Sequence, residues 1–464
     1  AELNAPHDLL ICDKQSQIKD LPSKAGLGLP YCIWMTETQF AVLSSVYILA
    51  GFIGAITAGP GSSSYGRLLA MRISSIFFII GSLLEMIATS VLIMSTGRFL
   101  VGIGAGVSTV VTPLYISEIS PPKAKGLFGT MTQVMICLGI LTSESLGYVF
   151  DREGQWRIIL GFGAGIGFID AIGLTFIPES PIWLASNMNY KHAVKILRRI
   201  RGADNLLDEI AGWNVRKDTL TEEDPLLSPQ TAKTSRPKKS NEPGLRDPRS
   251  KSLSQIGFLD VLRDPHYRPA IIAVIGIMFA QQLSGINSIN MYSVSLLRGL
   301  LPISSLLLTI LISLMNVITT ILCAPLPDWL GRKFCLLMSI IGMGAMSLLL
   351  AISLISGIKL LSALAVVLFV GFFATGLGPV PFMMASELVG QEAVGATQSW
   401  CLAGNYLSSY IVAQFFPLVN SWLNSILGGV GWVFFVFTAM AVVSWTFVTY
   451  FVPETKSKNR SVEI

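Results

Sequence analysis

Long apolar runs separated by short polar stretches make up most of the chain. An α-helix needs about 20 apolar residues to cross the hydrocarbon core of a bilayer. Eleven runs are about that long, and we predict spanning helices over residues 38–59, 68–95, 97–119, 126–150, 157–178, 268–297, 303–327, 333–357, 360–386, 394–420 and 428–452. The hydrophobic pattern therefore predicts an all-α polytopic membrane protein.

The polar positions between these runs predict an orientation. Lys and Arg accumulate in the cytoplasmic loops of membrane proteins. When the segment 185–268 is placed in the cytoplasm, 25 of the 33 Lys and Arg residues fall on that side. The predicted domains are then an extracytoplasmic segment (1–37), an N-terminal helical bundle (38–184), a cytoplasmic linker (185–267), a C-terminal helical bundle (268–452) and a cytoplasmic tail (453–464).

The composition agrees with a membrane protein and excludes other classes. Charged residues make up 13% of the chain, whereas a soluble chain has about 25%. The net charge of +5 is modest and the basic residues lie in loops, so we expect no nucleic-acid partner. All three histidines lie outside the apolar runs, so we expect no metal site and no cofactor there. Cys12 and Cys32 share one polar segment and either pair or stay free.

The predicted linker has two parts. Residues 188–202 form a basic amphipathic pattern, with Ala193, Leu197 and Ile200 on one face of a helix. Residues 203–256 are rich in Pro, Ser, Lys and Asp, a composition typical of disorder. Within them, EEDPLL (Glu222–Leu227) either binds sorting adaptors as an acidic dileucine signal or matches such a signal by chance.

Three short motifs recur in the two halves of the chain. The pairs, offset by 265, 269 and 275 residues, are Gly66-Arg67 with Gly331-Arg332, Ser117-Glu118 with Ser386-Glu387, and Pro178-Glu179-Ser180 with Pro453-Glu454-Thr455. Two parallel halves joined by a charged loop are typical of one large class of transporters. The second half has six predicted helices and the first has five, so the symmetry predicts a further helix before residue 1.

The repeated motifs place opposite charges at the cytoplasmic ends of helices. Glu118 can pair with Arg67 or Lys125, and Glu387 can pair with Arg332. Such pairs either lock one conformation and open in another, or remain solvated charges at helix ends. We predict gating salt bridges among Arg67, Glu118, Lys125, Glu179, Arg332, Glu387 and Glu454.

Polar side chains inside the predicted spans are candidates for a binding site, because hydrocarbon penalises them. The strongest cluster is QQLSGINSINMY (Gln281–Tyr292), whose amides suit a ligand built of hydroxyl groups and do not suit an ion. The alternative is hydrogen bonding between helices. GLGPVPF (Gly376–Phe382) predicts a broken helix. Isolated amides are Gln133, Asn316 and Asn405.

Glu144 is the acidic residue that the helical pattern connects to these amides. It follows Gln133 by eleven residues, which is about 20° beyond three full turns, so both side chains share one face. A carboxylate in a cavity can carry a proton. The alternative is a water-exposed residue in a vestibule.

Together these residues resemble the sugar porter family of the major facilitator superfamily. The resemblance covers nearly the whole chain and lies in GRFLVGIGAG (Gly97–Gly106), PLYISEISPPKAKG (Pro113–Gly126), PESP (Pro178–Pro181), QQLSGIN (Gln281–Asn287), DWLGRK (Asp328–Lys333) and PETK (Pro453–Lys456). It implies the major facilitator fold, with two pseudo-symmetric six-helix bundles of which eleven helices are present. ELNAP near the start resembles the stretch that follows the family's first helix.

The resemblance also implies where a sugar would bind. Family positions that bind sugar hydroxyls match Gln133, Gln281, Gln282, Asn287, Asn316 and Asn405, and positions often occupied by Trp match Phe382 and Tyr406. The chain departs from the family where Ala374 replaces a Glu common in hexose carriers. It also departs where SSSYGRLL lacks the Asp that usually precedes the first Gly-Arg motif.

We therefore expect a carrier of a hexose or related polyol and not an enzyme. It would work by alternating access in a lipid bilayer, either facilitated or coupled to protons. The expected location is a vacuolar, endosomal or plasma membrane. Two alternatives are a carrier of another small neutral solute and a sugar sensor that does not transport.

Overall fold

The computed structural model describes residues 29–30, 32–121, 124–150, 155–187, 189–202, 210, 256–289 and 305–455. The chain separates into two compact units, Ala1–Pro178 with Ile256–Ile464, and Glu179–Gln255. Cys12, Glu222–Leu227 and the last residues of the 281–292 motif lie outside the described residues. Cys32 is disulfide-bonded.

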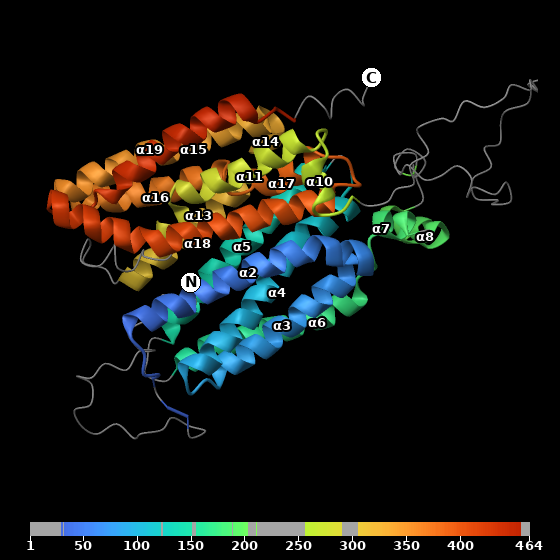
Figure 1. Cartoon of the computed structure of the whole chain (residues 1–464), viewed down its shortest axis with the longest axis horizontal. Coiled ribbons are helices and arrows are strands. Elements are labelled where there is room, and N and C mark those ends of the chain that lie inside the picture. Colours follow the sequence, from blue (N-terminus) through green and yellow to red (C-terminus); the bar gives the residue numbers. More distant parts are fainter. Residues whose placement is uncertain are drawn as a thin grey trace, which may run out of the picture. The chain divides into compact units, whose positions relative to one another are not determined.

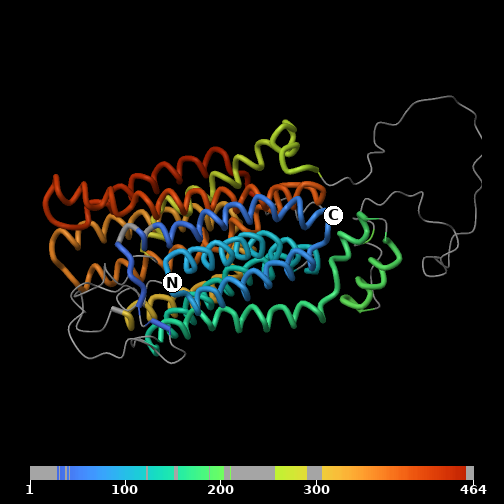
Figure 2. The backbone as a smooth tube through the Cα atoms, turned by 60° about the horizontal axis from the view of Figure 1, so that its bottom comes forward, coloured from blue at the N-terminus to red at the C-terminus, as the bar shows by residue number. Residues whose placement is uncertain are grey.

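Five long helices form the first half of the larger unit: α2 (Glu37–Tyr65), α3 (Arg67–Met86), α4 (Val91–Ile119), α5 (Lys125–Val149) and α6 (Trp156–Phe176). They run back and forth along one axis in both views (Figures 1 and 2). α4 packs against α2 and α3, and α3 packs against α6. Glycines permit this close packing, since a Cβ on Gly106 would lie 2.1 Å from the backbone oxygen of Gly51.

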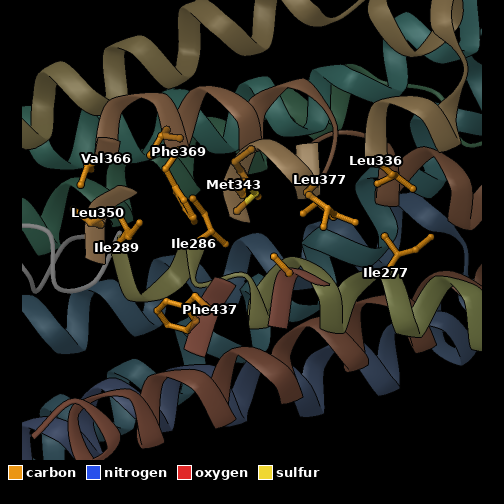
Figure 3. Packing of buried hydrophobic residues seen from close by; sticks show 14 of the residues in the cluster. Ile277, Ile286, Ile289, Leu336, Met343, Leu350, Val366, Phe369, Leu377 and Phe437 are labelled. Atoms are coloured by element: carbon orange, nitrogen blue, oxygen red, sulfur yellow. The ribbon is translucent and has the colours of Figure 1, made fainter. Parts of the chain in front are cut away.

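The second half contains α10 (Asp260–Arg263), α11 (Arg268–Leu283), α13 (Ser305–Cys323), α14 (Leu326–Leu330), α15 (Arg332–Ile355), α16 (Lys359–Thr375), α17 (Val380–Glu387), α18 (Val394–Leu427) and α19 (Val433–Phe451). α15 packs against α16 and α19, and α11 packs against α18 and α19. Their buried faces meet in an apolar core that includes Ile277, Met343, Phe369 and Phe437 (Figure 3). We call the end of the bundle that carries Arg67 and Arg332 the arginine end, and the other the far end.

The two halves meet along α18 on one side and α5 on the other. α18 packs against α2 and α4, and α5 packs against α13 and α17. Buried side chains from both halves form one further group, which we call the central cluster. It includes Val111 and Tyr115 of α4 with Met278 of α11, Phe382 of α17 and Leu402 of α18. The halves are therefore joined by packed apolar side chains.

Ten helices of the described residues are long and apolar enough to cross a membrane. They correspond to ten of the eleven predicted spans. The remaining prediction, 394–420, falls on α18, a single helix of 34 residues. α18 is not among the ten because polar side chains such as Gln398, Asn405 and Ser408 lower its hydropathy. These side chains are tolerated because α18 packs against α2, α4 and α11.

The predicted boundary between the second and third spans is wrong. The sequence pattern placed the second and third spans at 68–95 and 97–119, whereas α3 ends at Met86 and α4 begins at Val91. The cause is local, because the Ser90 side chain accepts a hydrogen bond from the backbone nitrogen of Ile93 and caps α4. Hydropathy alone does not detect such a cap.

The smaller unit contains α7 (Pro181–Ser186) and α8 (Tyr190–Arg201). Ala193, Ile196 and Leu197 of α8 are buried together with Leu184 of α7, as an amphipathic helix requires. Ile200 follows Ala193 by seven residues on the same face of α8, as predicted, and is 37% exposed. α7 has only 6 residues and pairs with the earlier turns of α8.

Candidate functional site

A break between α16 and α17 creates the centre of the site. α16 ends at Thr375 and α17 begins at Val380, which confirms the helix break predicted for the Gly376–Phe382 motif. The freed backbone group of Leu377 donates to the side chain of Ser339 at 3.1 Å, and Ser339 in turn donates to the carbonyl of Phe372 at 2.7 Å. A Cβ on Gly376 would lie 2.2 Å from the backbone oxygen of Cys335, so glycine is required there.

Gln281 joins three elements at this break. Its Nε2 donates to the carbonyl oxygen of Leu377. Its Oε1 accepts hydrogen bonds from Nδ2 of Asn405 at 2.6 Å and from Nε2 of Gln282 at 3.2 Å. We call these three amide side chains, of Gln281, Gln282 and Asn405, the amide network. Both glutamines are buried, and Oε1 of Gln282 has no hydrogen-bond partner within the described residues.

Asn287, a further amide of the same motif, lies apart from the network. Its Nδ2 donates to Oγ of Ser409 on α18 at 2.8 Å. Gln281 and Asn287 are therefore both tied to α18, the first through Asn405 and the second through Ser409. The donors and acceptors that these amide side chains can offer to a ligand carry no charge.

The two predicted aromatic residues lie beside the network and differ in position. Phe382 is buried in the central cluster with Met278 and Leu402. Tyr406 follows Asn405 directly, and its hydroxyl lies 3.4 Å from Oγ1 of Thr109 in the first half. Its ring also faces α2 of the first half, because a Cβ on Gly51 would lie 2.4 Å from that ring.

Gln133 and Asn316 form a second polar group between α5 and α13. Gln133 Nε2 donates to the sulfur of Cys137 at 3.4 Å, and that sulfur lies 3.8 Å from Oγ1 of Thr320. Thr320 donates to the backbone oxygen of Asn316. A Cβ on Gly378 would lie 3.4 Å from Cδ of Gln133. The helix break therefore lies between this group and the amide network.

Glu144 and Gln133 both lie on the buried face of α5. One carboxylate oxygen accepts a hydrogen bond from Oγ of Ser313 on α13 at 2.5 Å, and Glu144 is 9% exposed. The shared face inferred from the eleven-residue spacing is thus present. The contact crosses from the first half of the chain to the second.

The repeated Gly-Arg motifs fold alike. Arg67 forms a forked pair with Glu118, its Nη2 2.7 Å from Oε1, and donates through Nη1 to the carbonyl of Ser62. Arg332 forms the same fork with Glu387 at 2.9 Å and donates through Nη1 to the carbonyl of Pro327. Gly66 and Gly331 have φ values of 101° and 99°, which favour glycine. Each fork lies within one half.

The other predicted gating residues have different surroundings. Glu454 accepts hydrogen bonds from the backbone nitrogens of Arg332 and Lys333. Lys125 is exposed, and within the described residues it is Arg67 that pairs with Glu118. Glu179 belongs to the smaller unit, where it accepts a hydrogen bond from the nitrogen of Ser180. The gating role of all seven residues stays a prediction.

A packed corner at the arginine end was not predicted. The ring of Phe258 stacks on Trp400 of α18 at 4.4 Å. The hydroxyl of Tyr267 donates to Glu392 at 2.7 Å, and burial together with this carboxylate raises the pKa of Tyr267 to about 12. This corner positions the beginning of α18. No sequence motif marked it, because its members lie in three separate segments.

One family model matches nearly the whole chain. The family is described as "Sugar (and other) transporter", and the match covers residues 11–461.

Three curated relatives share this length. A probable metabolite transport protein of Saccharomyces cerevisiae is 32% identical over 100% of this chain and 91% of its own length. The solute carrier family 2, facilitated glucose transporter member 3, of Ovis aries is 30% identical over 89% of this chain and 79% of its own. Vacuolar protein sorting-associated protein 73 of Saccharomyces cerevisiae is 28% identical over 98% and 90%, respectively.

A solved structure has the same fold. The chain is similar, with a TM-score of 0.74, to the major facilitator superfamily proton:xylose symporter XylE bound to 6-bromo-6-deoxy-D-glucose. The identity is 21%, and the likeness covers 92% of this chain and 90% of that one. It shows the fold alone, and confirms the predicted all-α major facilitator fold.

Proposed function

Because the chain belongs to the sugar transporter family, whose model matches residues 11–461, we propose that it carries a hexose or a related polyol by alternating access. It is a multi-pass membrane transporter and not an enzyme. The proposal concerns four points: the sugar specificity, the residues that bind the sugar, the coupling to protons and the membrane of residence. The amide network is the observation that supports it best.

The amide network would hold the sugar. Amides donate and accept hydrogen bonds without charge, and Oε1 of Gln282 is a buried acceptor with no partner within the described residues. A sugar hydroxyl would satisfy it. Phe382 and Tyr406 would supply apolar ring faces for the pyranose, and Gln133, Asn287 and Asn316 would supply further polar contacts around the helix break.

The halves would move as rigid bodies around this site. Each Arg–Glu fork is internal to its half, so it would keep the arginine end of that half in shape while the halves separate. The central cluster and the α2–α18 contact would then be the parts that open and close. Binding must not favour one state so strongly that the cycle stops there.

The test is uptake of radiolabelled hexoses and polyols by proteoliposomes that contain the purified protein. We expect saturable uptake, and we expect Gln282→Ala to abolish it. Ser408→Ala is the matched control, since Ser408 is buried and donates to the backbone of its own helix. Binding without flux would indicate a sensor, and neither binding nor flux would point to another neutral solute.

We also propose that Glu144 carries a proton during transport. Its carboxylate is buried at the contact between α5 and α13 and is hydrogen-bonded to Ser313. Protonation would change the contact between the two halves. We expect Glu144→Gln to abolish accumulation driven by a pH gradient while sugar exchange at equilibrium persists. Equal loss of both activities, or gradient dependence that survives the substitution, would overturn this assignment.

The arginine end would face the cytoplasm, and the membrane would be vacuolar, endosomal or plasma membrane. A disulfide-bonded Cys32 before α2 fits an oxidising compartment at the far end. The relative named for vacuolar protein sorting supports a vacuolar membrane. Sorting adaptors would then bind Glu222–Leu227. Imaging of the tagged protein, with and without Leu226→Ala and Leu227→Ala, tests both points.

A further inference from the structure

Gln398 is a buried amide whose polar atoms have no partner within the described residues. It lies near the beginning of α18 and is 1% exposed, and neither Oε1 nor Nε2 forms a hydrogen bond. The hydroxyl of Thr397, which is 0% exposed, also lacks a partner there. Buried polar groups are nearly always satisfied. These atoms therefore need a partner from outside the described residues, which a water, a bound molecule or another state of the protein would supply.

Gln398 lies on the same face of α18 as Asn405 of the amide network. Seven residues separate them, which is only about 20° short of two helical turns. The rise of the helix places Gln398 about 10 Å nearer the arginine end. A solute that left the amide network along this face would meet Gln398 next.

The central cluster closes this route in the present structure. Cys401 and Leu402 lie one turn from Gln398 towards Asn405, and both are buried in this cluster together with Tyr115 of the first half. Ser399, which directly follows Gln398, accepts a hydrogen bond at 2.8 Å from the backbone nitrogen of Gly59 on α2. If the arginine end opens, these contacts between the halves must separate, and the beginning of α18 becomes accessible.

We propose that Gln398 and Thr397 form a second polar site for sugar hydroxyls, between the amide network and the arginine end. This inference rests on the proposed function, since the occupant is the transported solute. One amide and one hydroxyl offer donors and acceptors without charge. They suit a hydroxyl-rich neutral solute and do not suit an ion. The site would be occupied when the carrier is open towards the arginine end.

The experiment compares KM for sugar at the two faces of the membrane, in proteoliposomes of determined orientation. Gln398→Leu keeps a similar volume and removes the amide. We expect KM at the arginine-end face to rise about three- to tenfold, as the loss of one or two neutral hydrogen bonds implies. KM at the far-end face should stay within about twofold. Gln282→Ala should impair both faces, and Ser408→Ala neither.

Two results would overturn the inference. If the amide binds no solute and stays unsatisfied, Gln398→Leu would leave KM unchanged at both faces and raise the melting temperature, because an unsatisfied buried amide has been removed. If KM rises equally at both faces, Gln398 acts through packing. Thr397→Val provides an isosteric second variant that should show the same one-sided effect. Absence of uptake by the wild-type protein would instead refute the proposed function.

Discussion

Gln281 is the single residue on which the amide network depends. Its Oε1 accepts from Gln282 and Asn405, and its Nε2 donates to Leu377. Gln281→Leu would leave Nε2 of Gln282 and the carbonyl of Leu377 without this partner, at a cost of about 1–3 kcal/mol for each buried group, and would leave Nδ2 of Asn405 with only the sulfur of Met278. We expect KM for the sugar, measured by proteoliposome uptake, to rise by at least about tenfold.

Ser408→Ala is the control for this prediction. Ser408 is 1% exposed and lies three residues after Asn405, yet its hydroxyl donates to the backbone oxygens of Gly404 and Asn405 on its own helix. We expect its KM to stay within about twofold of wild type. A similar loss in both variants would mean that the packing of α18, and not the amide network, sets the affinity.

The sequence reveals which side chains are unusual but not which ones meet. Amides in apolar runs are visible because hydrocarbon penalises them, and Gln281, Gln282 and Asn405 were found in this way. Their partners depend on the register between α11, α18 and the helix break. Asn287 accordingly bonds to Ser409 instead of joining the network. Gln398 was missed because no motif surrounds it.

At the scale of elements, Ser339 supports the break between α16 and α17. Its hydroxyl accepts from the nitrogen of Leu377 and donates to the oxygen of Phe372. Ser339→Ala leaves the backbone nitrogen of Leu377 without an acceptor, at a cost of about 1–3 kcal/mol, whereas the oxygen of Phe372 keeps its hydrogen bond from Oγ1 of Thr375. Because the carbonyl of Leu377 also accepts from Gln281, we expect both a lower melting temperature and a higher KM for sugar.

Ser347→Ala tests whether this effect is local. Ser347 lies eight residues further along α15 and is 1% exposed, and within the described residues no hydrogen bond ties it to the break. We expect its KM to equal that of the wild type. If Ser339→Ala lowers stability but leaves KM unchanged, the break does not position the sugar site.

The elements themselves follow from the sequence in most of the chain. Span length and hydropathy are enough to place helices in lipid, since every backbone group must be satisfied internally. Glycine and proline were enough to predict the break after Thr375. Ser339 was not predictable, because it reaches the break from a helix about 40 residues earlier, and its role exists only once α15 and α16 are packed.

At the scale of the whole molecule, the repeat is visible in structure as well as in sequence. The 265-residue offset relates Arg67 to Arg332 and also relates their carbonyl acceptors, Ser62 and Pro327. The same offset relates Ser63 to Asp328, and there the two halves differ. Asp328 lies against the beginning of α5, where a Cβ on Gly126 would be 2.3 Å from its carboxylate. Ser63 is uncharged and lies against the beginning of α18, where a Cβ on Gly395 would be 3.2 Å from its Oγ.

Gly59 tests how the two halves move. A Cβ there would lie 2.4 Å from Oγ of Ser399 and 2.8 Å from the backbone oxygen of Gly395. The Ser399 side chain can rotate, but the backbone oxygen of α18 cannot. Gly59→Ala should therefore press α18 away from α2, and overpacking of this kind costs about 1–3 kcal/mol. That cost falls only on the state that is closed at the arginine end.

Cys401 reports the opening, because it is 0% exposed in the central cluster that joins the halves. We expect a membrane-impermeant maleimide to label Cys401 about tenfold faster in Gly59→Ala, as a shift of about 1.4 kcal/mol implies. Mass spectrometry of the Cys401 peptide separates it from the other cysteines. Gly61→Ala is the matched control on the same helix, since nothing lies within 4 Å of its added Cβ. Equal labelling of both variants would mean that α2 and α18 do not separate when the carrier opens, and that the moving contact lies between α5 and α13.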